Sequence, residues 1–195
     1  MIKIISYRKN IFLCLLLLIF SLNLTFTYGK EYTVLAAQKI KFRYQIGIIP
    51  FEGFFVLKDS TFTINFNNPE ASNLRLNFDL HSSSAGFLIA TSAMLSEQVL
   101  YAEKYPYILF ESKQVMMIDH KFEIKGNVTI RGITKPIILY ATLENPEVLE
   151  LTKKNNLLFT VSASFKRSDF NANGYEFIVG DVIDLNSNVE LVTSK

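Results

Sequence analysis

The sequence is dominated by short segments in which apolar and polar residues alternate. In one of them Ile40, Phe42 and Tyr44 are each followed by a charged or polar residue. Successive side chains of a β-strand point to opposite faces, so this pattern predicts a strand with one buried and one solvated face. The same two-residue period recurs at residues 61–66, 73–80, 122–130, 159–165 and 183–191. The chain is therefore predicted to be an all-β protein.

Turn-forming residues separate these segments at spacings of roughly ten residues. The predicted turns are at residues 58–60, 67–69, 119–120, 131–132, 155–156 and 171–174. Gly132 is expected to adopt a positive φ in its turn, because glycine has no Cβ to clash there. Such spacing is typical of an antiparallel sandwich or barrel. No linker or repeat divides residues 30–195, so we expect a single domain.

One segment has helical spacing instead. In residues 93–103 the side chains of Met94, Leu95, Val99 and Ala102 are spaced so as to share a helix face. Pro106 lacks a backbone N–H and would end such a helix. We predict one short helix at 93–103, preceded by a loop at 82–86. An irregular loop at 93–103 is the alternative.

The first 29 residues have the layout of a secretory signal peptide. Lys3, Arg8 and Lys9 precede an unbroken apolar run at 11–20, and Thr27 and Gly29 occupy the small-residue positions of a cleavage site. A transmembrane anchor is the alternative, although the run is shorter than the roughly 20 residues that span a bilayer. We predict a signal peptide at 1–29, a mature domain at 30–195, and a periplasmic or secreted location.

Composition excludes several classes of protein. The net charge is +2, which argues against a strongly basic nucleic-acid binder. A single Cys excludes a disulfide framework, and with only two His residues a conventional zinc site is not expected. Cys14 lies within the predicted signal peptide, so the mature domain is expected to contain no thiol. We predict no metal, no cofactor and no nucleic-acid partner.

Catalytic motifs are scarce. The chain has no nucleophile-elbow GxSxG, no P-loop and no HExxH motif. His81 and His120 are the only imidazoles; Asp79 shares a strand face with His81, but no third metal ligand is evident. The serines at 82–84 would form a nucleophilic site only with a histidine nearby. An enzyme is therefore not expected.

The aromatic content leaves two alternatives open. The chain has 17 Phe residues, many on alternate strand positions. Alternating Phe side chains fill the core of an ordinary sheet protein. They equally suit the wall of an apolar cavity, because a barrel of about eight strands has room inside for one small ligand.

Two stretches resemble a known family of exported bacterial proteins. Residues 105–115 (YPYILFESKQV) and 126–137 (GNVTIRGITKPI) are similar to the YPxxxFxS strand and the GxLTIRGxTKPV-like hairpin of the YceI family. Gly53 with Phe55, the segment 165–170 and the segment 180–189 match further family elements in the same order. The resemblance covers essentially the whole predicted mature chain.

The resemblance implies an antiparallel, lipocalin-like β-barrel of about eight strands with one short helix. It also implies non-covalent binding of a polyisoprenoid or similar long-chain amphiphile in the barrel, as a carrier or stress-related protein. A monomer or a homodimer and a transient membrane contact are compatible with it. The ligand is expected to contact inward-facing residues of the strands, for which the candidates are Phe42, Tyr44, Phe62, Ile64, Leu76, Phe78, Val128, Ile130, Phe159 and Val161. The Tyr44 hydroxyl is a candidate partner for a polar head group.

The chain also departs from the family pattern. Residues 35–39 replace the Asp and the His-Ser pair of the family's first strand, Lys58 stands where a second Phe is expected, and the family's Arg-Asp is replaced near residues 90–91. These positions lie where strands and loops shape a barrel mouth, so the head group of the ligand stays open. The alternative function is a structural or interaction barrel with a filled core and no ligand.

Overall fold

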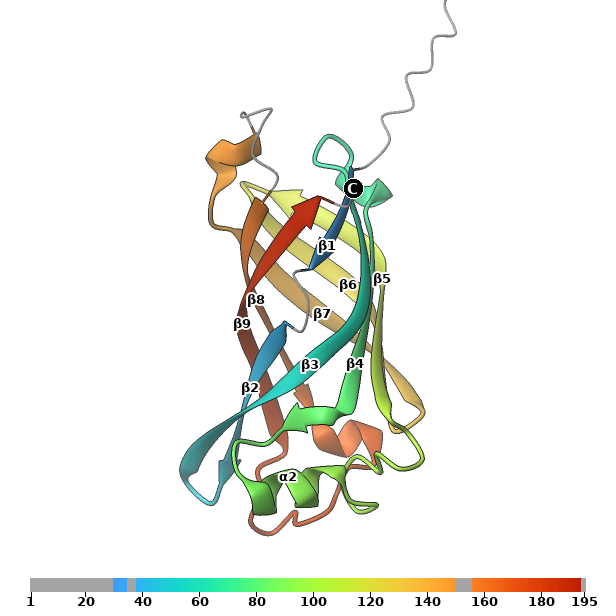
Figure 1. The fold of residues 1–195 in the computed structure, drawn as a ribbon, viewed down its shortest axis with the longest axis vertical. Coiled ribbons are helices and arrows are strands. Elements are labelled where there is room, and N and C mark those ends of the chain that lie inside the picture. Colours follow the sequence, from blue (N-terminus) through green and yellow to red (C-terminus); the bar gives the residue numbers. More distant parts are fainter. Residues whose placement is uncertain (1–29, 35–37, 150–155, 194–195) are drawn as a thin grey trace, which may run out of the picture.

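The computed structural model describes residues 30–34, 38–149 and 156–193, whose strands form one antiparallel sheet (Figure 1). The strands are β1 (Lys30–Val34), β2 (Lys39–Ile46), β3 (Ile49–Ile64), β4 (Asn73–Ser84), β5 (Tyr107–Ile118), β6 (Lys121–Ile130), β7 (Ile133–Leu143), β8 (Asn156–Lys166) and β9 (Val182–Thr193). The helices are α2 (Leu88–Leu95), η1 (Pro69–Ala71), η2 (Pro146–Leu149) and η3 (Arg167–Phe170). The predicted signal peptide, 1–29, lies outside the described residues.

The sheet closes into a barrel with eight strand positions. From β2 to β9 each strand pairs with the next, and β9 pairs back with β2. Phe42 of β2 lies between Gly53 of β3 and Leu185 of β9. Tyr32 of β1 also pairs with both β3 and β9, nearer the other end. Strands β1 and β2 thus share one position in the wall, and the predicted barrel of about eight strands is confirmed.

The hairpin turns show why the chain reverses where it does. Asp119 and His120 both have positive φ (48° and 64°), as do Arg131 and Gly132 (52° and 72°). Two consecutive positive-φ residues characterise the type I′ turn, whose twist matches that of the strands it joins. The positive φ predicted for Gly132 is confirmed.

Two predicted boundaries are wrong. Residues 58–60 do not form a turn, because β3 runs through them with a register shift against β4 between Leu57 and Asp59. Polar residues at a β-bulge bend a long strand without ending it, so they resemble a turn in the sequence. Residues 82–84 belong to β4 and are not a loop; the chain leaves the strand only at Ala85.

The predicted helix at 93–103 is also wrong in position, although the structure contains one short α-helix as expected. The helix is α2, Leu88–Leu95, and Ser96 at its end is extended (φ −62°, ψ 164°). Beyond it the chain makes consecutive turns, in which the Tyr101 N–H donates to the Ser96 carbonyl oxygen (2.8 Å). Leu100 and Ala102 are buried, so the spacing of apolar residues reflects packing against the barrel end.

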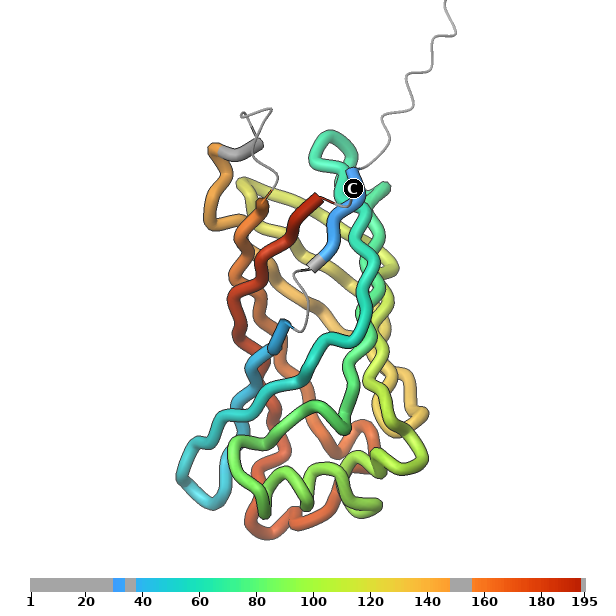
Figure 2. The backbone as a smooth tube through the Cα atoms, in the orientation of Figure 1, coloured from blue at the N-terminus to red at the C-terminus, as the bar shows by residue number. Residues whose placement is uncertain are grey.

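The end of the barrel beside α2 is closed by protein. Figure 2 shows α2 and the segment after β8 crossing this end. Phe170 of η3 is fully buried there, and its ring packs edge-on against Phe165 at 5.8 Å. None of the helices in the described part of the chain is both long and apolar enough to cross a membrane.

The buried Arg167 holds the segment that follows η3. Its guanidinium donates to the carbonyl oxygens of Gly174 (2.7 Å), Val179 (2.9 Å) and Gly180 (3.0 Å), and also to that of Ala172. Burial lowers the pKa of Arg167, with the charge of Asp181 opposing this effect. The hydrogen bonds to these four carbonyl oxygens replace those that the buried guanidinium would make with water. They also hold residues 172–180 against the barrel.

Candidate functional site

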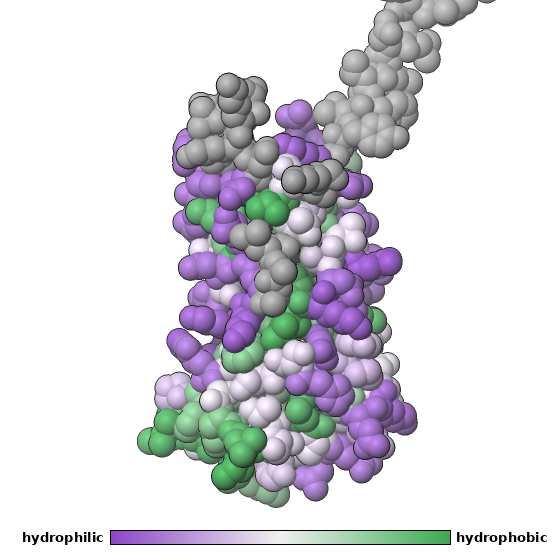
Figure 3. Space-filling model, viewed as in Figure 1, coloured by the Kyte–Doolittle hydropathy of each residue, from purple (hydrophilic) through white to green (hydrophobic). Residues whose placement is uncertain are grey.

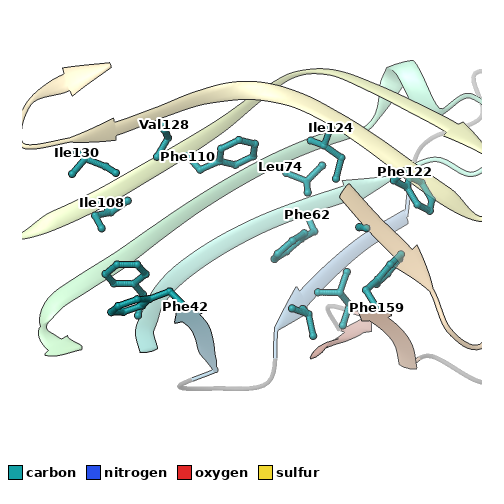
Figure 4. Close-up of a cluster of buried hydrophobic side chains, with 14 of the residues drawn as sticks. Phe42, Phe62, Leu74, Ile108, Phe110, Phe122, Ile124, Val128, Ile130 and Phe159 are labelled. Carbon is teal, nitrogen blue, oxygen red and sulfur yellow. The ribbon is translucent and has the colours of Figure 1, made fainter. Parts of the chain in front are cut away.

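The barrel interior contains an apolar cavity of about 140 Å³. Every strand from β2 to β9 contributes at least one side chain to its wall. Figure 4 shows Phe62, Phe110, Phe122 and Phe159 directed into this space from β3, β5, β6 and β8. The wall residues extend from Ile64, near β1, to Phe165, near η3, so they span most of the length of the barrel.

Eight of the ten predicted ligand-contact residues line the cavity. They are Phe62, Ile64, Leu76, Phe78, Val128, Ile130, Phe159 and Val161. They share the inward face of their strands, as the two-residue period predicts. Contact between these residues and a ligand stays a prediction.

Phe42 and Tyr44 are buried but lie outside the cavity wall. The Phe42 ring stacks on Phe55 with centroids 4.4 Å apart. The Tyr44 hydroxyl donates to the Ala85 carbonyl oxygen (2.8 Å), and burial raises the pKa of Tyr44. The hydroxyl hydrogen of Tyr44 is therefore engaged within the protein. Both residues belong to the packed core at the barrel end that carries α2.

The wall contribution of β5 was missed from the sequence. Ile108 and Phe110 face the cavity, but their outward neighbours Tyr107 and Leu109 are also apolar, which hides the alternation. A register shift between Ser112 and Gln114 then brings Val115 inward. Other wall residues beyond the predicted ten are Ile40, Phe55, Leu57, Leu74, Phe122, Ile124, Ile137, Leu139, Ala141, Ala163, Phe165, Leu185, Val189 and Leu191.

Gln38 is a polar group in this wall, beside the interval between β1 and β2. Its Nε2 donates to the Asn188 carbonyl oxygen (3.2 Å), which fixes the orientation of the amide because a carbonyl only accepts. Its Oε1 is buried and has no hydrogen-bond partner among the residues that the structure describes. The other polar wall residues of the described chain are Ser72 and Ser162, and the wall includes no charged side chain. The accessible lining of the cavity is apolar, because the Gln38 Oε1 is buried behind it, and the described residues offer no cation for an anionic group.

The candidate catalytic residues are engaged in local hydrogen bonds. Asp79 accepts from the Ser82 hydroxyl (2.7 Å) and from the His81 backbone N–H (3.0 Å), and the Ser82 bond lowers the pKa of Asp79 while burial opposes the shift. The Ser83 hydroxyl donates to the Asp79 carbonyl oxygen and accepts from the Val56 N–H. Across the ranges described, no three His, Cys, Asp or Glu residues are grouped in a way that suits a metal ion.

The closed barrel and its apolar interior define the class: a lipocalin-like antiparallel β-barrel. A family model for the YceI-like domain matches residues 32–191. The chain therefore belongs to the YceI family, as the two motif stretches indicate. Curated relatives named Protein YceI, for example from Salmonella arizonae, are 30% identical over 105 residues. That match covers 53% of this chain and spans about half (55%) of the relative's length.

Solved structures share the fold. BcnA of Burkholderia cenocepacia superposes with a TM-score of 0.66 at 19% identity, covering 80% of this chain and 96% of that one. A YceI protein of Campylobacter jejuni gives a TM-score of 0.59 at 25% identity, over 71% and 84%. A polyisoprenoid binding domain of Saccharophagus degradans gives 0.59 at 9% identity, over 84% and 98%. The predicted fold class is thus confirmed.

Proposed function

We propose that this protein binds a polyisoprenoid or similar long-chain amphiphile inside the barrel. The observation that carries the proposal is the continuous apolar cavity wall, to which every strand from β2 to β9 contributes and which includes no charged residue of the described chain. Removing apolar ligand surface from water contributes about 25 cal/mol per Å². The solved polyisoprenoid binding domain of the same fold supports this choice of ligand class.

The proposed role is that of a binding and carrier protein, not of an enzyme. The hydroxyls and the carboxylate near His81 are engaged in structural hydrogen bonds, and the described part of the cavity wall presents no acid, base or cation. We further propose that residues 1–29 are removed during export, so that the domain acts in the periplasm or outside the cell. The charged and apolar layout of those residues supports this proposal.

A long chain requires the interior to widen. A cavity of about 150 Å³ accommodates benzene, so the present 140 Å³ matches only a short piece of an isoprenoid. Phe62, Phe110, Phe122 and Phe159 project into the interior and are among the largest side chains of the wall. We propose that these rings rotate aside as the chain enters.

Protein purified from its native periplasm is expected to retain a lipid, detected as a bound mass in native mass spectrometry. Ala163→Leu places three more carbons in the cavity, because Ala163 is buried in its wall. We expect the variant to retain at least about tenfold less lipid, since each buried methylene contributes about 0.8 kcal/mol. Ser164→Leu, on the exposed face of the same strand, is the matched control and is expected to retain lipid normally.

The alternative function predicts a different result. In a structural barrel with a filled core, the wild-type protein carries no lipid, and Ala163→Leu alters only stability. A lipid-free wild type that also fails to take up added polyprenol would contradict the proposed function.

Gln38 is expected to select the polar end of the ligand. Its Oε1 is buried without a partner among the described residues, and we propose that ligand entry exposes it. An alcohol or primary amide then satisfies this acceptor, whereas a pure hydrocarbon leaves it unpaired. Gln38→Met keeps the length of the side chain and removes the acceptor. We expect weaker binding of a polyprenol by about 5–10-fold, as for the loss of one buried hydrogen bond, and no loss for the matching hydrocarbon. Equal losses for both ligands would show that Gln38 acts only through packing.

A further inference from the structure

A group of apolar side chains projects from the barrel end that carries α2. Ile48 and Ile49 come from the β2–β3 hairpin, Phe87, Leu88 and Ile89 from the start of α2, and Phe177 and Ile178 from the segment between η3 and β9. We call these residues the apolar tip. Ile48 is 94% exposed, Leu88 81% and Phe177 95%. Such exposure of large apolar side chains is costly in water and indicates an interaction surface.

The three segments form one surface. The Gly47 N–H donates to the Ile178 carbonyl oxygen (2.7 Å), which joins the hairpin to the segment before β9. The Phe51 and Phe87 rings lie 5.5 Å apart, which joins the hairpin to α2. On the face that Figure 3 shows, apolar residues gather at this end, whereas polar residues predominate along the barrel wall.

The tip is almost free of charge. Segments 45–51, 85–96 and 174–180 contain one charged side chain between them, Glu176. Tyr175 in the same segment is half-exposed, with an apolar ring and a polar hydroxyl. A partner of this surface therefore has to be apolar itself, with a polar margin that suits tyrosine.

We propose that the apolar tip inserts into the surface of a lipid bilayer. The core of a protein interface is a closely packed surface. Nearly fully exposed side chains on separate loops have little protein surface beside them with which to form such a core. A fluid apolar phase receives each of them without such complementarity. Tyrosine is enriched at membrane–water interfaces, where its hydroxyl meets the headgroups. The scarcity of charge further specifies zwitterionic lipid over an anionic surface.

Docking in this way leaves the barrel wall in water. The ion pair between Arg75 and Glu111 lies on exposed strand faces away from the tip. Arg167 fixes the segment that carries Phe177 and Ile178, because it donates to the carbonyl oxygens of Gly174 and Val179. The inference is independent of the proposed cavity ligand, because it concerns the outer surface of the closed end.

The test is flotation with phosphatidylcholine vesicles. The strand pairings that the structure describes close the barrel within residues 30–193, so the chain starting at Lys30 is used, which also removes the apolar N-terminal run. We expect this protein to float with the vesicles at both low and high salt. Ile48→Asp and Phe177→Asp are expected to reduce bound protein at least about tenfold, because each removes an inserted apolar side chain.

Ile118→Asp is the matched control. Ile118 is 75% exposed but lies at the β5–β6 hairpin, at the opposite barrel end, so this variant is expected to bind vesicles normally. Unchanged melting temperatures would confirm that all three variants fold. An equal loss for Ile118→Asp, or salt-sensitive binding to anionic vesicles alone, would overturn the proposal. The proposal would also be overturned if the wild-type protein bound no vesicles but self-associated, and if the tip variants abolished that self-association. Ligand retention is measured separately, so failure of either proposal is distinguishable.

Discussion

Replacement of Arg167 by leucine is expected to lower the free energy of unfolding by about 4 kcal/mol. The guanidinium is the common donor for four backbone carbonyl oxygens between Ala172 and Gly180. Its residue is only 7% exposed, so the carbonyl groups that lose their donor have restricted access to water. Hydrogen bonds to a charged donor contribute about 1.5–3 kcal/mol each, and partial rehydration of the loop recovers some of the loss.

Arg167→Lys separates charge from geometry. An ammonium retains the positive charge but has three donors on one nitrogen, so it does not reproduce the planar arrangement of the guanidinium. We therefore expect Arg167→Lys to lower the free energy of unfolding by more than half as much as Arg167→Leu does, as measured by urea denaturation. Arg75→Leu is the control, because the Arg75 side chain is 69% exposed and pairs with Glu111 at the surface. Similar stability losses for Arg75→Leu and Arg167→Leu would contradict the assigned role.

Gly126→Ala is expected to cost about 3 kcal/mol, although it adds a single methyl group. A Cβ at this position would lie 2.5 Å from the Glu111 carbonyl oxygen and 2.6 Å from the Phe110 ring. The oxygen belongs to β5, which pairs directly with β6 at Ser112 and Gly126, so it moves only if the ladder is distorted. A shift of the Phe110 ring would also change the cavity wall.

Gly180→Ala is the matched control for this substitution. Its Cβ would meet Gln45 at 3.5 Å, an ordinary van der Waals contact, and the effect is expected to be small. The midpoint of urea denaturation is expected to fall for Gly126→Ala with little change in slope. If both alanine variants unfold at the same denaturant concentration, the close approach at Gly126 is not a constraint on the barrel.

The strands and most of their inward faces are predictable from local sequence. At Phe122, Ile124, Val128 and Ile130 the period is uninterrupted, and all four side chains are buried. A strand has only two faces, so a clear period assigns each side chain once the apolar face is known. Prediction fails where this rule is broken: at the bulge after Leu57, and at the shift after Ser112.

The helix and the cavity depend on contacts that a local pattern does not contain. Val99 and Ala102 pack into the core at the barrel end but lie beyond α2, so their spacing falsely predicts a helix. Phe42 and Phe78 follow the same alternation, yet Phe78 lines the cavity whereas Phe42 stacks on Phe55. Phe78 lines the cavity and Phe42 does not because the two side chains lie at different positions along the barrel axis. The register between neighbouring strands determines those positions.

The apolar tip illustrates the same division. Ile48, Leu88 and Phe177 belong to three separate segments, and no short-range pattern associates them. By itself, the sequence determined the all-β class and the inward face of most strands, because these depend on periods of a few residues. It also indicated the family, through the resemblance of two motif stretches. Only the tertiary structure decided which inward side chains enclose space, which fill it, and which apolar residues gather at one end. Those properties arise from closure of the barrel, which brings side chains from distant segments together.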